Sequence, residues 1–130
     1  MSDSVKILIV EDDPLIAAHL ETIIERGRRH GVGVAADAET ALVLAERTLP
    51  AVAIVDVRLK GGIDGLTVGR ELLERYGTSL VFVTAHLDQA VRHFPERGVF
   101  FVGKPFTDND ILLAVEQAVG DHQFAGTRPL

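Results

Sequence analysis

The stretch that decides the fold is Val5-Lys6-Ile7-Leu8-Ile9-Val10-Glu11-Asp12-Asp13-Pro14. Its first six residues form a short apolar run rich in β-branched side chains, which is typical of a buried strand. Pro14 then indicates a helix start, because its fixed φ suits the first helical turn. Beyond it, apolar residues recur at helical spacing: Ile16, Leu20, Ile23 and Ile24. The stretch therefore predicts a strand, an acidic loop and an amphipathic helix in direct succession.

The same alternation runs through the rest of the chain. Further strands are predicted at 32–36, 51–55, 80–83 and 99–102, and the weakest of them, 32–36, should lie at an edge. Helical apolar spacing follows each of these runs. Fully apolar strands separated by amphipathic helices predict an α/β fold, a doubly wound five-stranded parallel sheet covered on both faces. The crossovers should be right-handed, and five units are too few for an eight-stranded barrel.

Composition narrows the classes of function. The 130 residues carry a net charge of −6 and no cysteine, which excludes disulfides and thiol chemistry. The acidic balance argues against direct binding to nucleic acid or to an anionic membrane. The start of the chain does not resemble a secretory signal, and no apolar run is long enough for a membrane span, so we expect a cytoplasmic protein. We expect one domain over residues 1–120 and a short polar tail over 121–130.

Polar side chains collect where the predicted strands end. Ligands of open parallel sheets bind beyond the carboxyl ends of the strands, and carboxylates gathered there repel one another unless a cation lies between them. Oxygen ligands without cysteine or a spaced histidine pair favour Mg²⁺ or Mn²⁺ over Zn²⁺. A carboxylate can attack phosphorus, and an ammonium and a hydroxyl can bind phosphoryl oxygens. The residues in question are Glu11, Asp12 and Asp13 after the first strand, Asp56 after the third, Thr84 after the fourth and Lys104 after the fifth.

From about Val5 to Val119, the chain resembles the receiver domains of bacterial response regulators, which act in two-component signalling. The matching motifs are Glu11-Asp12-Asp13-Pro14, Asp56, Asp64-Gly65, Val83-Thr84-Ala85 and Lys104-Pro105-Phe106. The resemblance implies the flavodoxin-like (βα)5 fold and a phosphorelay in which Asp56 is the phospho-acceptor. It implies that Asp12, Asp13, Asp56 and the backbone carbonyl of Arg58 hold Mg²⁺, and that Thr84 and Lys104 contact the phosphoryl group. The Lys104–Pro105 bond should be cis, as in the family.

Some positions depart from the usual family pattern. The loop after Asp56 is one residue longer than the commonest form, with Lys60-Gly61-Gly62 in place of a proline-containing turn. The switch aromatic, which would act together with Thr84, is Phe101 rather than tyrosine. Arg58 and His86 stand two residues after Asp56 and Thr84, and we expect them to modulate hydrolysis of the phosphate by controlling water access. We expect Glu11 to be a solvated or secondary residue and Asp64-Gly65 to be a turn that caps a helix.

The resemblance also implies partners. The phosphate should come from a sensor histidine kinase or a phosphotransfer protein, and a downstream protein should bind the surface near residues 85–106 together with the last helix. The domain should assist only its own phosphorylation and dephosphorylation, without acting as an enzyme in turnover. A homodimer is left open; the sequence favours a stand-alone regulator over an excised fragment. Three alternatives remain: a phosphate-independent binding module, a flavin-binding module, and an aspartate-nucleophile phosphatase, for which Arg58 occupies the place of the usual second acid.

Overall fold

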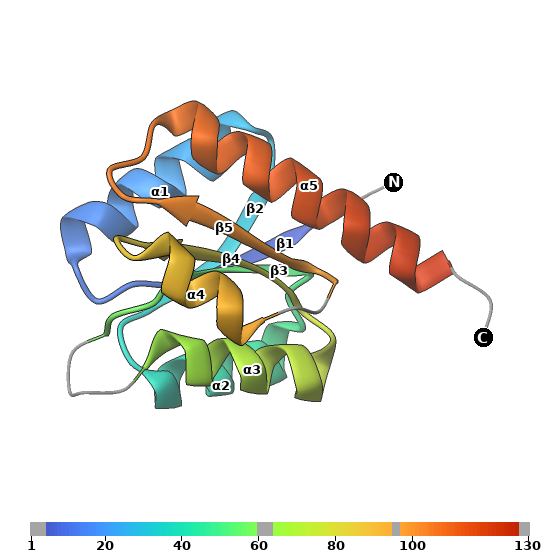
Figure 1. Ribbon diagram of the computed structural model, residues 1–130. Helices are drawn as coiled ribbons and strands as arrows, with labels where there is room; N and C mark the ends of the chain where they lie inside the picture. Colours follow the sequence, from blue (N-terminus) through green and yellow to red (C-terminus); the bar gives the residue numbers. More distant parts are fainter. Residues whose placement is uncertain (1–4, 60–63, 95–96, 128–130) are drawn as a thin grey trace.

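The computed structural model describes residues 5–59, 64–94 and 97–127. Five strands and five helices alternate along this part of the chain (Figure 1). The strands are β1 (Lys6–Val10), β2 (His30–Ala35), β3 (Val52–Asp56), β4 (Ser79–Thr84) and β5 (Val99–Gly103). The helices are α1 (Pro14–Arg26), α2 (Ala38–Thr48), α3 (Gly65–Tyr76), α4 (Leu87–His93) and α5 (Asp108–Thr127). The predicted order of elements is confirmed.

The strands form one parallel sheet in the order β2-β1-β3-β4-β5. The chain leaves β1 toward β2 on one side and returns to β3 on the other, so the strand order reverses between β1 and β3. Such a reversal opens a crevice at the carboxyl ends of the strands, where ligands of doubly wound sheets bind. The doubly wound five-stranded sheet predicted from the sequence is therefore confirmed, with β2 at an edge as expected.

Helices cover both faces of the sheet, with α1 and α5 on one side and α2 and α3 on the other (Figure 1). The side chains of β1 alternate between two separate cores, because successive residues of a strand point to opposite faces. Ile7 and Ile9 pack with α1 and α5, whereas Leu8 and Val10 pack with α2 and α3. Burial on both faces explains why the strands read as continuous apolar runs rather than as alternating patterns.

Two boundaries differ from the sequence prediction by more than one residue. Strand β2 begins at His30, two residues before the predicted start. Helix α5 continues through Thr127, so residues 121–127, predicted as part of a polar tail, are helical. Within the described residues, no helix combines the length and the apolar character that a membrane crossing requires.

Candidate functional site

Three polar residues are buried at the carboxyl edge of the sheet, beside the reversal between β1 and β3. Asp56 ends β3 and is 6% exposed, Thr84 ends β4 and is 4% exposed, and Glu11 follows β1 and is 3% exposed. Buried carboxylates are rare in proteins unless they are paired or coordinated. This edge is therefore the candidate functional site.

Asp56 is held from two sides. Its Oδ1 accepts a hydrogen bond from the backbone N–H of Arg58 at 3.0 Å. Its Oδ2 lies 3.3 Å from the Nζ of Lys104, which is half-buried at the end of β5. The backbone N–H of Lys104 donates to the carbonyl of Thr84 at 2.8 Å, so the lysine is anchored to the neighbouring strand. The structure thus brings Asp56, Thr84 and Lys104 together, as predicted.

A cluster of three carboxylates lies at the same edge. Ligand oxygens of Glu11, Asp12 and Asp56 all lie within 4.8 Å of one another. Burial raises the pKa of Glu11 from its ordinary value of 4.5 to about 7, and the charge of Asp56 and a hydrogen bond to its carboxylate act in the same direction. A backbone hydrogen bond from Asp13 opposes this rise. Such a set of hard oxygen donors fits Mg²⁺, which binds through one or two carboxylates while keeping several waters.

The structure shows how the first acidic segment is arranged. Asp13, predicted as a metal ligand, is the N-cap of α1: its Oδ1 accepts from the N–H of Leu15 at 2.9 Å and of Ile16 at 3.3 Å. Glu11, predicted as a solvated or secondary residue, is buried rather than solvated, and its Oε2 accepts the N–H of Asp13 at 3.0 Å. The reason is position, since β1 ends at Val10 and the next residue meets the sheet edge, whereas Asp13 has already reached the helix start. The carboxylate cluster gathers Glu11 and Asp12 with Asp56, and the role of Asp13 as a metal ligand stays a prediction.

The proposed modulators, Arg58 and His86, border a cavity of about 420 Å³ beside the site. Thr84 lines the same cavity, and its Oγ1 accepts the N–H of His86 at 2.9 Å. Both side chains are exposed to solvent. Arg58 also forms an isolated antiparallel bridge with Asp64, which joins the two ends of the loop after Asp56. The unusual Lys60-Gly61-Gly62 segment lies outside the described residues, and the modulator roles stay predictions.

Gly65 has a role that the sequence did not reveal. Asp64 caps α3 by accepting the N–H of Leu66 at 2.9 Å, which confirms the predicted capping turn. Gly65 itself is buried against the strand that ends at Asp56, and its N–H donates to the carbonyl of Val57 at 2.7 Å. A Cβ at this position would overlap the backbone oxygen of Asp56 and lie 2.8 Å from the Cα of Val57. Only glycine allows α3 to begin this close to Asp56.

The remaining predicted residues lie on β5 and directly after it. The Lys104–Pro105 peptide bond is cis, as predicted. Phe101 is half-buried, and its ring stacks on that of Phe82 with 5.8 Å between the ring centroids. It therefore faces the core on the α2 and α3 side of the sheet. Its role as a switch stays a prediction.

Comparison with known proteins agrees with this geometry. The model of the response regulator receiver domain family matches residues 7–116. The phyllosphere-induced regulator PhyR of Methylorubrum extorquens is 31% identical over 124 residues, covering 95% of this chain and 46% of that protein. The transcriptional regulatory protein PdtaR of Mycobacterium tuberculosis is 30% identical over 116 residues, covering 88% and 56%. The chain spans about half the length of these curated relatives.

Solved structures give the same result. The response regulator PhyR from Brucella abortus superposes with a TM-score of 0.83 at 28% identity, covering 95% of this chain and 51% of that one. The anti-anti-sigma factor PhyR from Bartonella quintana also gives 0.83, at 25% identity, covering 97% and 51%. Because the family match extends over nearly the whole sheet and the fold agrees, this chain belongs to the response regulator receiver domain family.

Proposed function

We propose that this receiver domain accepts a phosphoryl group on Asp56 from a sensor histidine kinase or a phosphotransfer protein. The observation that carries the proposal is the 3.3 Å contact between Lys104 Nζ and Asp56 Oδ2 beside the carboxylates of Glu11 and Asp12. A buried aspartate beside a fixed ammonium and a set of acidic oxygens has the parts that phosphoryl transfer needs: a nucleophile, a cation site and a donor for phosphoryl oxygens.

The chain's own residues account for most of the proposed step. A carboxylate oxygen of Asp56 forms a bond to phosphorus while the phosphorus–nitrogen bond of the donor histidine breaks. The electron pair leaves with the imidazole, which takes a proton from water. Lys104 and the Thr84 hydroxyl bind phosphoryl oxygens in the product. Mg²⁺, held by Glu11, Asp12, Asp56 and the carbonyl of Arg58, would neutralise the charge of the transferring group. The domain would turn over no separate substrate.

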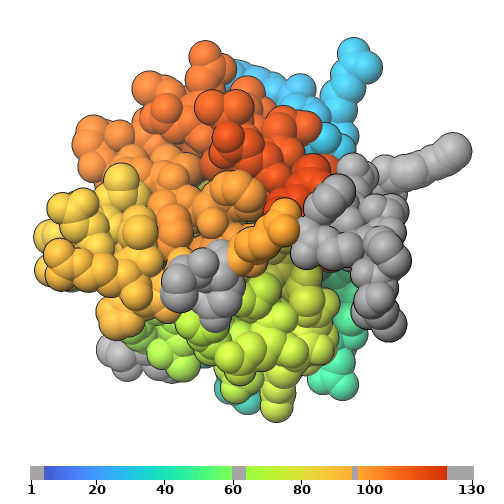
Figure 2. All heavy atoms as spheres, turned by 45° about the vertical axis from the view of Figure 1, so that its right-hand side comes forward, coloured from blue at the N-terminus to red at the C-terminus, as the bar shows by residue number. Residues whose placement is uncertain are grey.

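A downstream protein would bind the face formed by α4, β5 and α5. These elements lie next to one another on one side of the molecule (Figure 2). Two of these elements carry exposed large apolar side chains, namely Leu87 and Val91 on α4 and Leu113 on α5. Phosphorylation would shift the population of conformations at Thr84, which ends the neighbouring strand β4, and at Phe101, which lies on β5 itself, and so alter binding.

One relative indicates which class of downstream protein to test first. The Bartonella quintana structure is described as that of an anti-anti-sigma factor. We therefore offer an anti-sigma factor as the first protein to test against the α4, β5 and α5 face. Stronger binding after phosphorylation would support this assignment, and equal binding by the Leu113→Ala variant would argue against the face.

The decisive experiment is intact mass after incubation with acetyl phosphate and Mg²⁺. The wild type should gain one phosphoryl group and Asp56→Asn should gain none. If neither protein gains mass, beryllofluoride binding distinguishes a strict need for the kinase from the alternative, a phosphate-independent binding module. Beryllofluoride binding by the wild type would support the acceptor role, whereas its absence would favour the alternative.

A further inference from the structure

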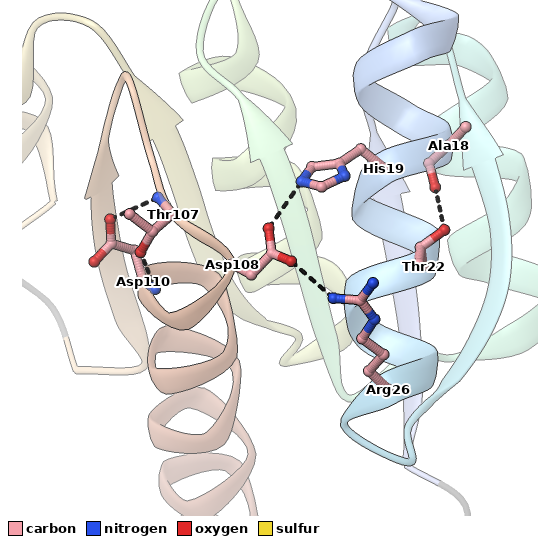
Figure 3. Close-up of polar contacts among 7 residues, drawn as sticks. All are labelled: Ala18, His19, Thr22, Arg26, Thr107, Asp108 and Asp110. Carbon is pink, nitrogen blue, oxygen red and sulfur yellow. Dashed lines mark hydrogen bonds and ion pairs between the residues drawn. The ribbon is translucent and has the colours of Figure 1, made fainter.

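The segment that carries Lys104 is a short connection between β5 and α5, fixed at both ends. At its start, the N–H of Lys104 donates to the carbonyl of Thr84 at 2.8 Å. At its end, Thr107 and Asp110 bond reciprocally: the N–H of Thr107 donates to Asp110 Oδ2 at 2.9 Å, and the N–H of Asp110 donates to Thr107 Oγ1 at 3.1 Å (Figure 3). The reciprocal pair is a helix cap of the capping-box kind, with aspartate in place of glutamate. The cap fixes where α5 begins.

Side chains of helix α1 contact the connection between β5 and α5 and the first residue of α5. Asp108, the first residue of α5, lies between His19 and Arg26 of α1 (Figure 3). Its Oδ1 is 2.9 Å from His19 Nε2, and its Oδ2 accepts from Arg26 at 3.0 Å. His19 and Arg26 are seven residues apart, so they lie on one face of the helix. The ring of His19 also stacks on Phe106, with centroids 6.3 Å apart and planes at 20°. His19 thus contacts both Asp108, at the start of α5, and Phe106, within the connection between β5 and α5.

The same helix is joined to the acidic cluster at its other end. Asp13 caps α1 with its carboxylate, and its N–H donates to the carboxylate of Glu11 at 3.0 Å. A helix is a rigid element, so its N-terminus and the side of its second turn keep a fixed separation. Helix α1 therefore links the carboxylates that would hold the cation to the connection that carries the lysine.

We propose that His19 is a positioning residue for phosphoryl transfer, which sets the place of Lys104 relative to Asp56 by holding Phe106 and Asp108 against α1. This inference rests on the proposed function for its effect on the reaction, although the contact itself can be tested without phosphate. His19 touches none of the reacting groups, so its influence passes through the backbone of the connection. Its loss removes the stacking on Phe106 and one of the two contacts between α1 and Asp108, and it leaves the cap of α5 intact.

A purely structural role predicts a different result. The side chains of His19, Arg26 and Asp108 are 52%, 66% and 39% exposed. Pairs this exposed contribute little to the overall free energy of unfolding, because solvent screens them. Replacing His19 should therefore leave the unfolding midpoint nearly unchanged while it loosens the connection locally. An unchanged unfolding midpoint together with a slower gain of the phosphoryl group would indicate a positioning role.

The test compares His19→Ala, His19→Gln and His30→Ala. Glutamine keeps a hydrogen-bond donor toward Asp108, and His30 is an exposed histidine on the edge strand β2, away from the connection. The first readout is hydrogen exchange of the Lys104 amide in the unphosphorylated protein. The second is the rate of phosphoryl gain from acetyl phosphate, measured by intact mass over a range of donor concentrations.

The expected result is faster Lys104 amide exchange and about fivefold slower phosphoryl gain in His19→Ala, a usual size for a residue outside the site. His19→Gln should recover part of both losses, and His30→Ala should behave as the wild type. Unchanged amide exchange in His19→Ala would overturn the inference whether or not the protein is phosphorylated. Faster exchange with an unchanged rate of phosphoryl gain would also overturn it, while leaving the proposed function in place. A wild type that neither gains a phosphoryl group nor binds beryllofluoride would contradict the proposed function, and amide exchange would then decide the inference alone.

Discussion

The raised pKa of Glu11 predicts that the acidic site destabilises the fold at neutral pH in the absence of a cation. The perturbation that tests this is Glu11→Gln. Glutamine has nearly the same shape, its carbonyl can still accept the N–H of Asp13, and its amide can donate to Asp56. The variant therefore removes the ionisation of Glu11 while preserving the hydrogen bonds that surround it.

The size of the effect follows from linkage. The unfolded chain loses the Glu11 proton near pH 4.5 and the native protein near pH 7, so between these values the native state binds more protons. The free energy of unfolding of the wild type must then fall as pH rises through this window. At about 1.4 kcal/mol per pKa unit, the full difference between the native and the unfolded pKa of Glu11 corresponds to about 3 kcal/mol of unfolding free energy. About 2 kcal/mol of it should be lost between pH 5.5 and 8, because part is already lost below pH 5.5.

The assay is urea unfolding followed by circular dichroism at several pH values, with a chelator present. The wild type and Glu11→Gln share the same five histidines, so their titrations cancel in the difference between the two proteins. The advantage of the variant should grow by about 2 kcal/mol from pH 5.5 to pH 8. Parallel pH profiles for the two proteins would refute the raised pKa and with it the electrostatic account of the site.

Three further predictions concern the same edge of the sheet. Because Mg²⁺ must displace the Glu11 proton, its affinity for the wild type, measured by calorimetry, should be about tenfold higher at pH 8 than at pH 6, and a pH-independent affinity would contradict this. Gly65→Ala should lower the free energy of unfolding by about 3 kcal/mol, because the added Cβ would overlap the backbone of Asp56. The control Gly120→Ala, with open space around it, should raise the free energy of unfolding by up to about 1 kcal/mol. Equal urea midpoints for the two variants would be inconsistent with the packing described. Arg58→Ala and His86→Ala should each change the rate of dephosphorylation, followed by loss of the added mass, and unchanged rates would exclude a role in water access.

The sequence predicted the sheet well because burial on both faces leaves a strong signal. Continuous apolar runs such as 51–55 and 80–83 coincide closely with β3 and β4. The signal is weaker at β2, where the burial of most residues is only intermediate and two glycines interrupt the run. The end of α5 was missed for another reason, because a polar composition does not by itself end a helix, and α5 continues through Thr127.

The strand-end residues of the site were easier to predict from the sequence than the arrangement of the acidic residues 11–13. Asp56, Thr84 and Lys104 each end an apolar run or closely follow one, so their place at the sheet edge followed from the strands. The acidic segment offers three consecutive carboxylates, and composition alone cannot tell which of them faces the sheet. Counting from the last strand residue would have selected Glu11, and Pro14 would have identified Asp13 as the cap. The contacts of Asp108 with α1 could not be foreseen, because His19 lies 89 residues away in the sequence.

The charges at the edge explain why a proton, a cation and a phosphoryl group should be coupled there. With Glu11, Asp12 and Asp56 all ionised, three carboxylates gather at this edge, where Lys104 Nζ lies 3.3 Å from Asp56 Oδ2. Burial makes this gathering of negative charge costly, and the proton on Glu11 lowers the repulsion at the expense of one oxygen ligand. A divalent cation would also lower the repulsion while leaving that ligand in place. Cation binding would therefore reduce the repulsion that an anionic phosphoryl group meets as it approaches.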